Sequence, residues 1–90
     1  MTWNLVVLDS FFSNWHFYPF EVQEAVLDHI DSLGSDPLGF IDRNAATIPT
    51  GTLYTHLVIR LDRRSWEFLA YFRLKADVST VIVEWLHLIP

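Results

Sequence analysis

The sequence predicts a single α+β domain over residues 1–90, with the element order β-α-α-β-β-β. A mainly antiparallel four-stranded sheet is expected, with the helices packed on one face. Three observations lead to this prediction. Ninety residues are too few for two independent cores. Apolar residues recur at helical spacing in the first half of the chain, and three runs with strand periodicity follow in the second half.

The chain opens with a strand and short helical turns. Residues 3–8 form an aliphatic run without helical period, which favours a strand. Residues 11–17 contain closely spaced aromatic side chains and have room for one or two helical turns. Pro19 then suits the first turn of the next helix, where its missing N–H costs nothing.

The main helix is predicted at residues 19–33. Its apolar residues share one face at helical spacing: Val22, Val26, Ile30 and Leu33. Gly34 is placed as the residue that stops this helix. All three glycines lie within residues 34–52, so this segment is predicted to be a long loop. The loop is expected to be pinned to the core by Phe40, Ile41 and Ile48.

Three strands are predicted next, at residues 53–61, 66–74 and 80–89, and their short connections favour an antiparallel meander. A four-residue loop over residues 62–65 sets Leu61 opposite Trp66. The same register gives three pairs on the outer face of the sheet: Arg60 with Glu67, His56 with Tyr71, and Tyr54 with Arg73.

The last strand allows two registers. One register places Val81, Val83 and Trp85 in the core and turns Glu84 outward. The other buries the Glu84 carboxylate without a partner, which costs several kcal/mol. The first register is therefore predicted, and it points His87 to the core side of the sheet.

The two faces of the sheet differ in character. The main helix is predicted to pack on the inner face, which carries Leu57, Ile59, Phe68 and Phe72. The outer face mixes polar groups with aromatic side chains, as a binding surface does. Its candidate binding residues are Tyr54, His56, Glu67, Tyr71 and Arg73.

Composition excludes several classes of function. The chain has no cysteine, which removes disulfides and thiolate chemistry and predicts a cytoplasmic protein. No apolar run approaches the ~18 residues that a membrane span needs. The four histidines are scattered over different elements, and neither a phosphate-binding loop nor a nucleophile motif occurs. No metal and no cofactor are therefore predicted.

Charge is unevenly distributed along the chain. Residues 1–42 contain seven acidic residues and no Lys or Arg, whereas all six cations lie in residues 43–90. Nucleic-acid binding usually needs a basic stripe that neutralises several phosphates. The net charge of −5 and the small number of cations therefore disfavour broad, sequence-independent nucleic-acid binding and leave a protein partner open.

Four segments of the sequence resemble segments of one known protein superfamily. They are YPFEVQEAV at residues 18–26, DPLG at residues 36–39, PTGTLY at residues 49–54 and FLAYF at residues 68–72. Together with the element order, they resemble the helix, loop and strand segments of the RelE/ParE toxin superfamily. The resemblance extends over nearly the whole chain and implies a RelE-like fold.

The resemblance also implies an activity and its site. Some members of that superfamily are ribosome-dependent mRNases that use basic residues, a general acid or base and a C-terminal Tyr or His; others bind DNA gyrase. On this basis the candidate catalytic residues are His56, Arg60, Arg73 and His87. The set is incomplete, because Leu88 stands where a Tyr often follows the C-terminal His.

Two functions remain open. The first is a RelE/ParE-like toxin–antitoxin domain that binds an antitoxin-like peptide, either as an mRNA endonuclease or as a degenerate member acting through protein binding. The second is a non-catalytic protein-interaction module or homodimer unrelated to toxins. The incomplete catalytic set and the few cations favour a chain without enzymatic activity.

Overall fold

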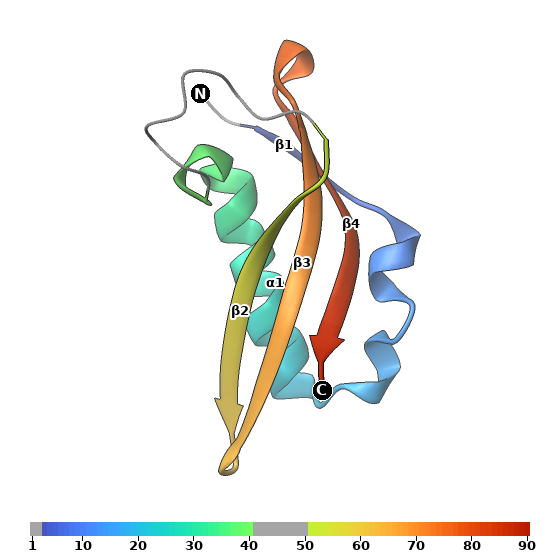
Figure 1. Ribbon diagram of the computed structural model, residues 1–90, viewed down its shortest axis with the longest axis vertical. Helices are drawn as coiled ribbons and strands as arrows, with labels where there is room; N and C mark the ends of the chain where they lie inside the picture. The colour runs from blue at the N-terminus through green and yellow to red at the C-terminus, as the bar shows by residue number, and fades with distance from the viewer. Residues whose placement is uncertain (1–2, 41–50) are drawn as a thin grey trace.

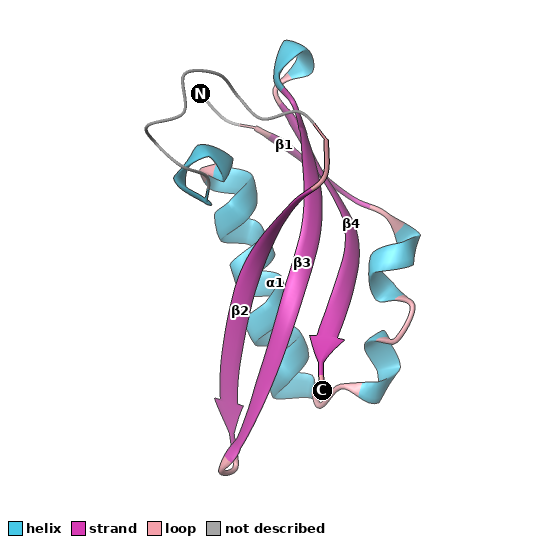
Figure 2. Cartoon of the chain, viewed as in Figure 1, coloured by secondary structure: helices cyan, strands magenta, loops and turns pink. Residues whose placement is uncertain are grey.

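The computed structural model describes residues 3–40 and 51–90, with one long helix packed against a four-stranded sheet (Figure 1). In chain order the elements are β1 (Asn4–Val7), the 3-10 turns η1 (Asp9–Phe12) and η2 (Trp15–Phe17), α1 (Phe20–Ser35), η3 (Pro37–Phe40), β2 (Leu53–Leu61), β3 (Arg64–Lys75), η4 (Ala76–Val78) and β4 (Thr80–Ile89). The predicted α+β class is confirmed (Figure 2).

The strand order in the sheet is β1-β4-β3-β2. β2, β3 and β4 form the predicted antiparallel meander. β1 runs parallel to β4 and pairs only with its first part, from Asn4 opposite Thr80 to Val7 opposite Val83. The sheet is therefore mixed, and η1 and η2 lie beside the second part of β4 (Figure 1).

The predicted packing of α1 on the inner face is confirmed. The buried side chains of the helix are those of Val22, Val26, Ile30 and Leu33. Phe68 and Phe72 of β3 are fully buried, and Leu57 and Ile59 of β2 pack against this core from its margin. Burial of one apolar helix stripe against one sheet face is thus the main source of stability in this chain.

Gly34 lies inside α1, so the prediction that it stops the helix is wrong. A Cβ at Gly34 would approach the Leu5 side chain of β1 to 3.3 Å, which is tighter than ordinary van der Waals contact. The missing side chain therefore lets α1 approach β1 closely. The predicted loop begins after Ser35 with η3, and its residues 41–50, including Ile41 and Ile48, lie outside the described residues.

A two-residue turn joins β2 to β3, so the predicted four-residue loop is wrong. Asp62 and Arg63 have φ values of 50° and 66°, the left-handed conformation that type I′ hairpin turns require at both positions. Arg64 and Ser65 extend β3, and the Arg64 guanidinium lies 3.9 Å from the centroid of the Trp66 ring. This cation–π contact favours pairing up to the turn.

The shorter turn shifts the pairing of β2 with β3 by two residues, so the three predicted outer-face pairs are wrong. The observed pairs are Arg60 with Ser65, Val58 with Glu67, His56 with Leu69, and Tyr54 with Tyr71. Because side chains alternate with a period of two, a shift of two residues leaves each side chain on its predicted face.

The aromatic segment between β1 and α1 is divided between core and surface. Phe11 and Tyr18 are buried, and the Tyr18 ring meets the rings of Trp66 and Phe68 nearly edge-on. Burial raises the pKa of the Tyr18 hydroxyl. Phe17, by contrast, is 70% exposed. In the part of the chain that the structure describes, no helix is both long and apolar enough to cross a membrane.

The helix–sheet packing predicts a large loss of stability on truncation. Replacement of Ile30 or Phe68 by Ala should lower the free energy of unfolding by about 2–5 kcal/mol, because each leaves a cavity in a fully packed region. Leu27→Ala, on the exposed side of the same helix, is the matched control. Urea unfolding followed by far-UV circular dichroism measures both. Equal losses of unfolding free energy in Ile30→Ala and Leu27→Ala would contradict the packing of α1 on the sheet.

We expect His29 to make stability depend on pH. Its Nε2 lies 3.1 Å from the Thr55 hydroxyl oxygen, and partial burial lowers the pKa of the imidazole below its ordinary value near 6.5. As pH falls through 6.5, the unfolded chain takes up this proton before the folded chain does, so stability declines. The difference in unfolding free energy between wild type and His29→Gln should shrink between pH 7 and 5.5. His16→Gln is the surface control. If the difference in unfolding free energy between wild type and His29→Gln stays constant over this pH range, protonation of His29 does not affect stability.

Candidate functional site

An irregularity in β4 decides which of its side chains reach the outer face. Phe72 of β3 pairs with Val83, but the preceding Tyr71 pairs with Trp85. Glu84 is therefore an extra residue between two successive pairs, which is a β-bulge. Beyond it, every side chain of β4 has the opposite orientation to the one that unbroken alternation would give.

Two predictions for β4 are wrong because of this bulge. Trp85 was expected in the core, yet it pairs with the outer-face residue Tyr71 and is 39% exposed. His87 was expected on the core side, yet it pairs with Leu69 of the outer face and is exposed. Leu86 is buried in their place, and Leu88 packs against the core.

The outer face therefore carries two ordered rows of side chains across β2, β3 and β4. The first row is aromatic and comprises Tyr54, Tyr71 and Trp85. The second row comprises His56, Leu69 and His87. The two tyrosine rings lie 6.3 Å apart between centroids, and Tyr54 is 63% exposed. These rows place both predicted histidines on one surface, with Leu69 between them.

His56 has an acidic partner on this face. Its Nε2 lies 3.2 Å from Oε2 of Glu67, which is two residues along β3 from Leu69, the residue directly opposite His56. Glu67 therefore contacts His56, and the predicted Arg60–Glu67 pairing is wrong. Arg60 lies opposite Ser65, next to the hairpin turn. A carboxylate in this position orients the imidazole ring.

Arg73 is engaged by the bulge residue. Its Nε lies 2.9 Å from Oε1 of Glu84, whose side chain is 28% exposed. The Glu84 oxygen is shielded from solvent, and the contact is an ion pair without the alignment of a hydrogen bond. Arg73 lies opposite Ile82, not opposite Tyr54 as predicted. Its charge is therefore partly neutralised before any ligand arrives.

The predicted site residues thus form a patch with one outlier. Tyr54, His56, Glu67, Tyr71 and His87 share the middle of the outer face, Arg73 adjoins it, and Arg60 lies toward the hairpin tip. Within residues 3–40 and 51–90, no group of three or more side chains of the metal-binding types is arranged to hold a metal ion. Whether the patch is a catalytic or a binding site stays a prediction.

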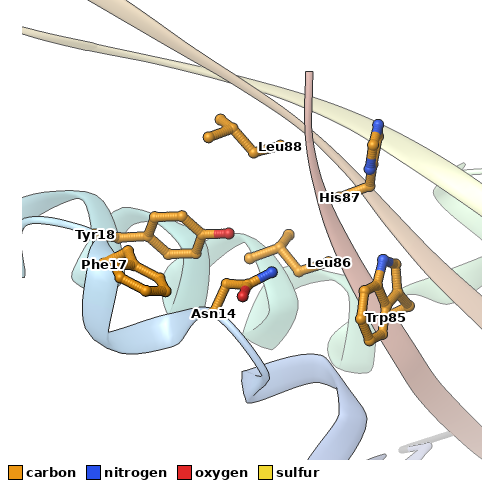
Figure 3. Close-up of a pocket in the computed structure, with 7 residues that line it drawn as sticks. All are labelled: Asn14, Phe17, Tyr18, Trp85, Leu86, His87 and Leu88. Atoms are coloured by element: carbon orange, nitrogen blue, oxygen red, sulfur yellow. The ribbon is translucent and has the colours of Figure 1, made fainter. Parts of the chain in front are cut away.

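Sequence reasoning missed a second feature, a pocket of about 430 Å³ between β4 and the η2 region (Figure 3). Its lining residues are Asn14, Phe17, Tyr18, Trp85, Leu86, His87 and Leu88. The many aromatic residues before α1 indicate an apolar surface in this region, but they do not identify β4 as the opposite wall of a pocket. The bulge makes that wall by turning two leucines toward Tyr18.

Comparison with known proteins gives one informative match. A chain in the crystal structure of the toxin–antitoxin complex RelBE2 from Mycobacterium tuberculosis superposes with a TM-score of 0.62 at 11% sequence identity, covering 99% of this chain and 100% of that one. The chain has a RelE-like fold. No protein-family model and no curated protein sequence matches it. The predicted resemblance is thereby confirmed at the level of fold.

The bulge predicts that Glu84 can be deleted without changing the faces of the residues that follow it. Deletion makes Val83 and Trp85 consecutive, so strict alternation keeps Leu86 and Leu88 inward and Trp85 and His87 outward. We expect the unfolding free energy to fall by about 1 kcal/mol or less, because both leucines stay buried and only the ion pair with Arg73 is lost. Glu84→Ala, which keeps the bulge and removes the same ion pair, is the matched control. Urea unfolding measures both variants, and a loss of about 3 kcal/mol or more in the deletion variant alone would contradict this account of β4, since each leucine turned outward loses about 1.5–3 kcal/mol of burial.

Proposed function

We propose that this chain is the RelE-like member of a toxin–antitoxin pair and that it acts by binding a protein partner of the antitoxin type. The likeness of fold over nearly the whole chain to a component of a toxin–antitoxin complex carries this proposal. Exposed apolar side chains on the outer face of the sheet support it. Tyr54, Val58 and Trp85 are each at least 39% exposed and share that face. Exposed aromatic and apolar side chains on one face are typical of protein interfaces.

The charges on the outer face favour binding over phosphodiester cleavage. Cleavage needs unpaired cations beside the reacting phosphate to stabilise the developing negative charge. Arg73, the cation next to the central patch, is paired with Glu84. Arg60 lies toward the hairpin tip, away from His87. The net charge of −5 also opposes approach to RNA.

One observation favours a second candidate function, ribosome-dependent mRNA cleavage. The His56–Glu67 contact is the arrangement that a general base uses, because the carboxylate fixes the orientation of the ring. His87 lies on the same face, one strand beyond Leu69, and is a candidate general acid. This version requires the phosphate to displace Glu84 from Arg73.

Co-expression tests the proposed function. The chain is produced in bacteria alone and together with the product of the adjacent open reading frame. We expect growth to slow with the chain alone and to recover with the neighbour, and we expect the two proteins to co-elute on size-exclusion chromatography. Harmless high-level expression, with no complex formed, would contradict the proposal. Elution of the chain alone at twice its mass would favour the homodimer.

A cleavage assay separates binding from catalysis. Purified wild-type chain and its Arg73→Ala variant are incubated with ribosomes and end-labelled mRNA, beside an active toxin as positive control. We expect no cleavage by either protein. Cleavage by wild type that falls by about 10²–10³ in Arg73→Ala would instead establish Arg73 as a catalytic residue.

A further inference from the structure

The second half of β4 has an open edge. The last backbone contact to the N-terminal segment is the Leu8 N–H bonded to the Val83 carbonyl at 2.9 Å, and the Ser10 hydroxyl then donates to the Glu84 carbonyl. Among the described residues, no strand pairs with residues 85–89 on this side. Since successive strand residues alternate between neighbours, about every second residue here turns its N–H and C=O to the open edge.

The pocket lies directly against this edge. Figure 3 shows Leu86 and Leu88 pointing from β4 toward Tyr18, with Phe17 and Asn14 on the same side. Tyr18 is buried, so it forms a firm floor, whereas Phe17 is exposed and forms the outer wall. The pocket is thus an apolar trough that runs beside unpaired backbone groups.

The two segments that form this trough carry carboxylates and no Lys or Arg, although none of the carboxylates lines the pocket itself. Residues 9–21 and 80–89, which form its two sides, contain no Lys or Arg. They contain three carboxylates, those of Asp9, Glu21 and Glu84. Glu84 is paired with Arg73, which leaves the carboxylates of Asp9 and Glu21 near the two ends of the η1–η2 wall.

We propose that the trough binds an extended segment of a protein partner, which adds as a strand to β4 at residues 85–89. Its main chain pairs with the open edge, and its alternate apolar side chains contact Tyr18, Leu86 and Leu88. Lys or Arg residues flank the apolar ones, because the carboxylates of Asp9 and Glu21 lie near the ends of one wall and neither wall carries a Lys or Arg. A second copy of this chain fits poorly, since it would bring another wall without Lys or Arg against the first. The identity of the partner as antitoxin rests on the proposed function, but the trough and its chemistry do not.

Selection from a random library tests the proposal without knowledge of the partner. Displayed peptides of about ten residues, the length of a long strand, are selected on the immobilised full chain. We expect enriched peptides to alternate apolar residues and to carry flanking Lys or Arg. Enrichment of acidic or helical sequences, or no enrichment, would overturn the proposal.

Two lysine variants locate the binding site of the best peptide. Phe17→Lys places a cation on the trough wall and should weaken affinity by at least about tenfold. Phe20→Lys is the matched control, because Phe20 is equally exposed at 68% but does not line the pocket, and it should change affinity by less than about twofold. Thermal unfolding verifies that both variants are folded. Equal effects of the two variants would exclude the trough.

Amide hydrogen exchange tests the strand pairing itself. Bound peptide should slow exchange at alternate amides within residues 85–89, and protection confined to the Tyr54–Tyr71–Trp85 row would place the peptide elsewhere. The outcomes remain distinct from those of co-expression. If the neighbouring gene product binds Phe17→Lys as tightly as wild type, the trough proposal fails while the proposed function stands. If expression is harmless but peptides bind as described, the proposed function fails while the trough proposal stands.

Discussion

The bulge at Glu84 is the constraint on which the surface of this molecule depends. The inner face of β4 must present apolar side chains to α1 along its whole length, and the available residues are Val81, Val83, Leu86 and Leu88. Their spacing changes from two to three between the second and third. One residue must therefore leave the ladder, and Glu84 does so while its carboxylate meets Arg73. Core packing thereby determines what faces solvent.

The elements and their faces follow from the sequence because they depend on local periodicity. Val22, Val26, Ile30 and Leu33 repeat at helical spacing, and no other conformation buries all four on one side. The β2 and β3 faces are equally well defined, since alternation of apolar and polar residues fixes them whatever the turn. For this reason Tyr54, His56, Glu67 and Tyr71 lie on the predicted face even though every predicted cross-strand pair is wrong.

The remaining features depend on single residues that periodicity does not report. Asp62 and Arg63 adopt left-handed conformations without the Asn-Gly signature of a two-residue turn, so the sequence pattern predicts a four-residue loop instead. In β4, both uniform registers were unfavourable: one buried Glu84, and the other left Leu86 and Leu88 outside. The bulge avoids both costs. When both regular registers of a strand either bury a charge or expose apolar residues, the sequence itself indicates a bulge.

Because of the same bulge, the last residues of β4 present aromatic and polar side chains on the outer face and leucines on the inner face. Trp85 and His87 join the outer-face rows, while Leu86 and Leu88 line the trough beside the open edge. A strand added at this edge would extend the sheet, and its outward side chains would lie next to Trp85 and His87. Such a strand would therefore also alter access to the His56–Leu69–His87 row. The bulge at Glu84 thus brings the proposed binding edge and the outer-face rows together on one strand.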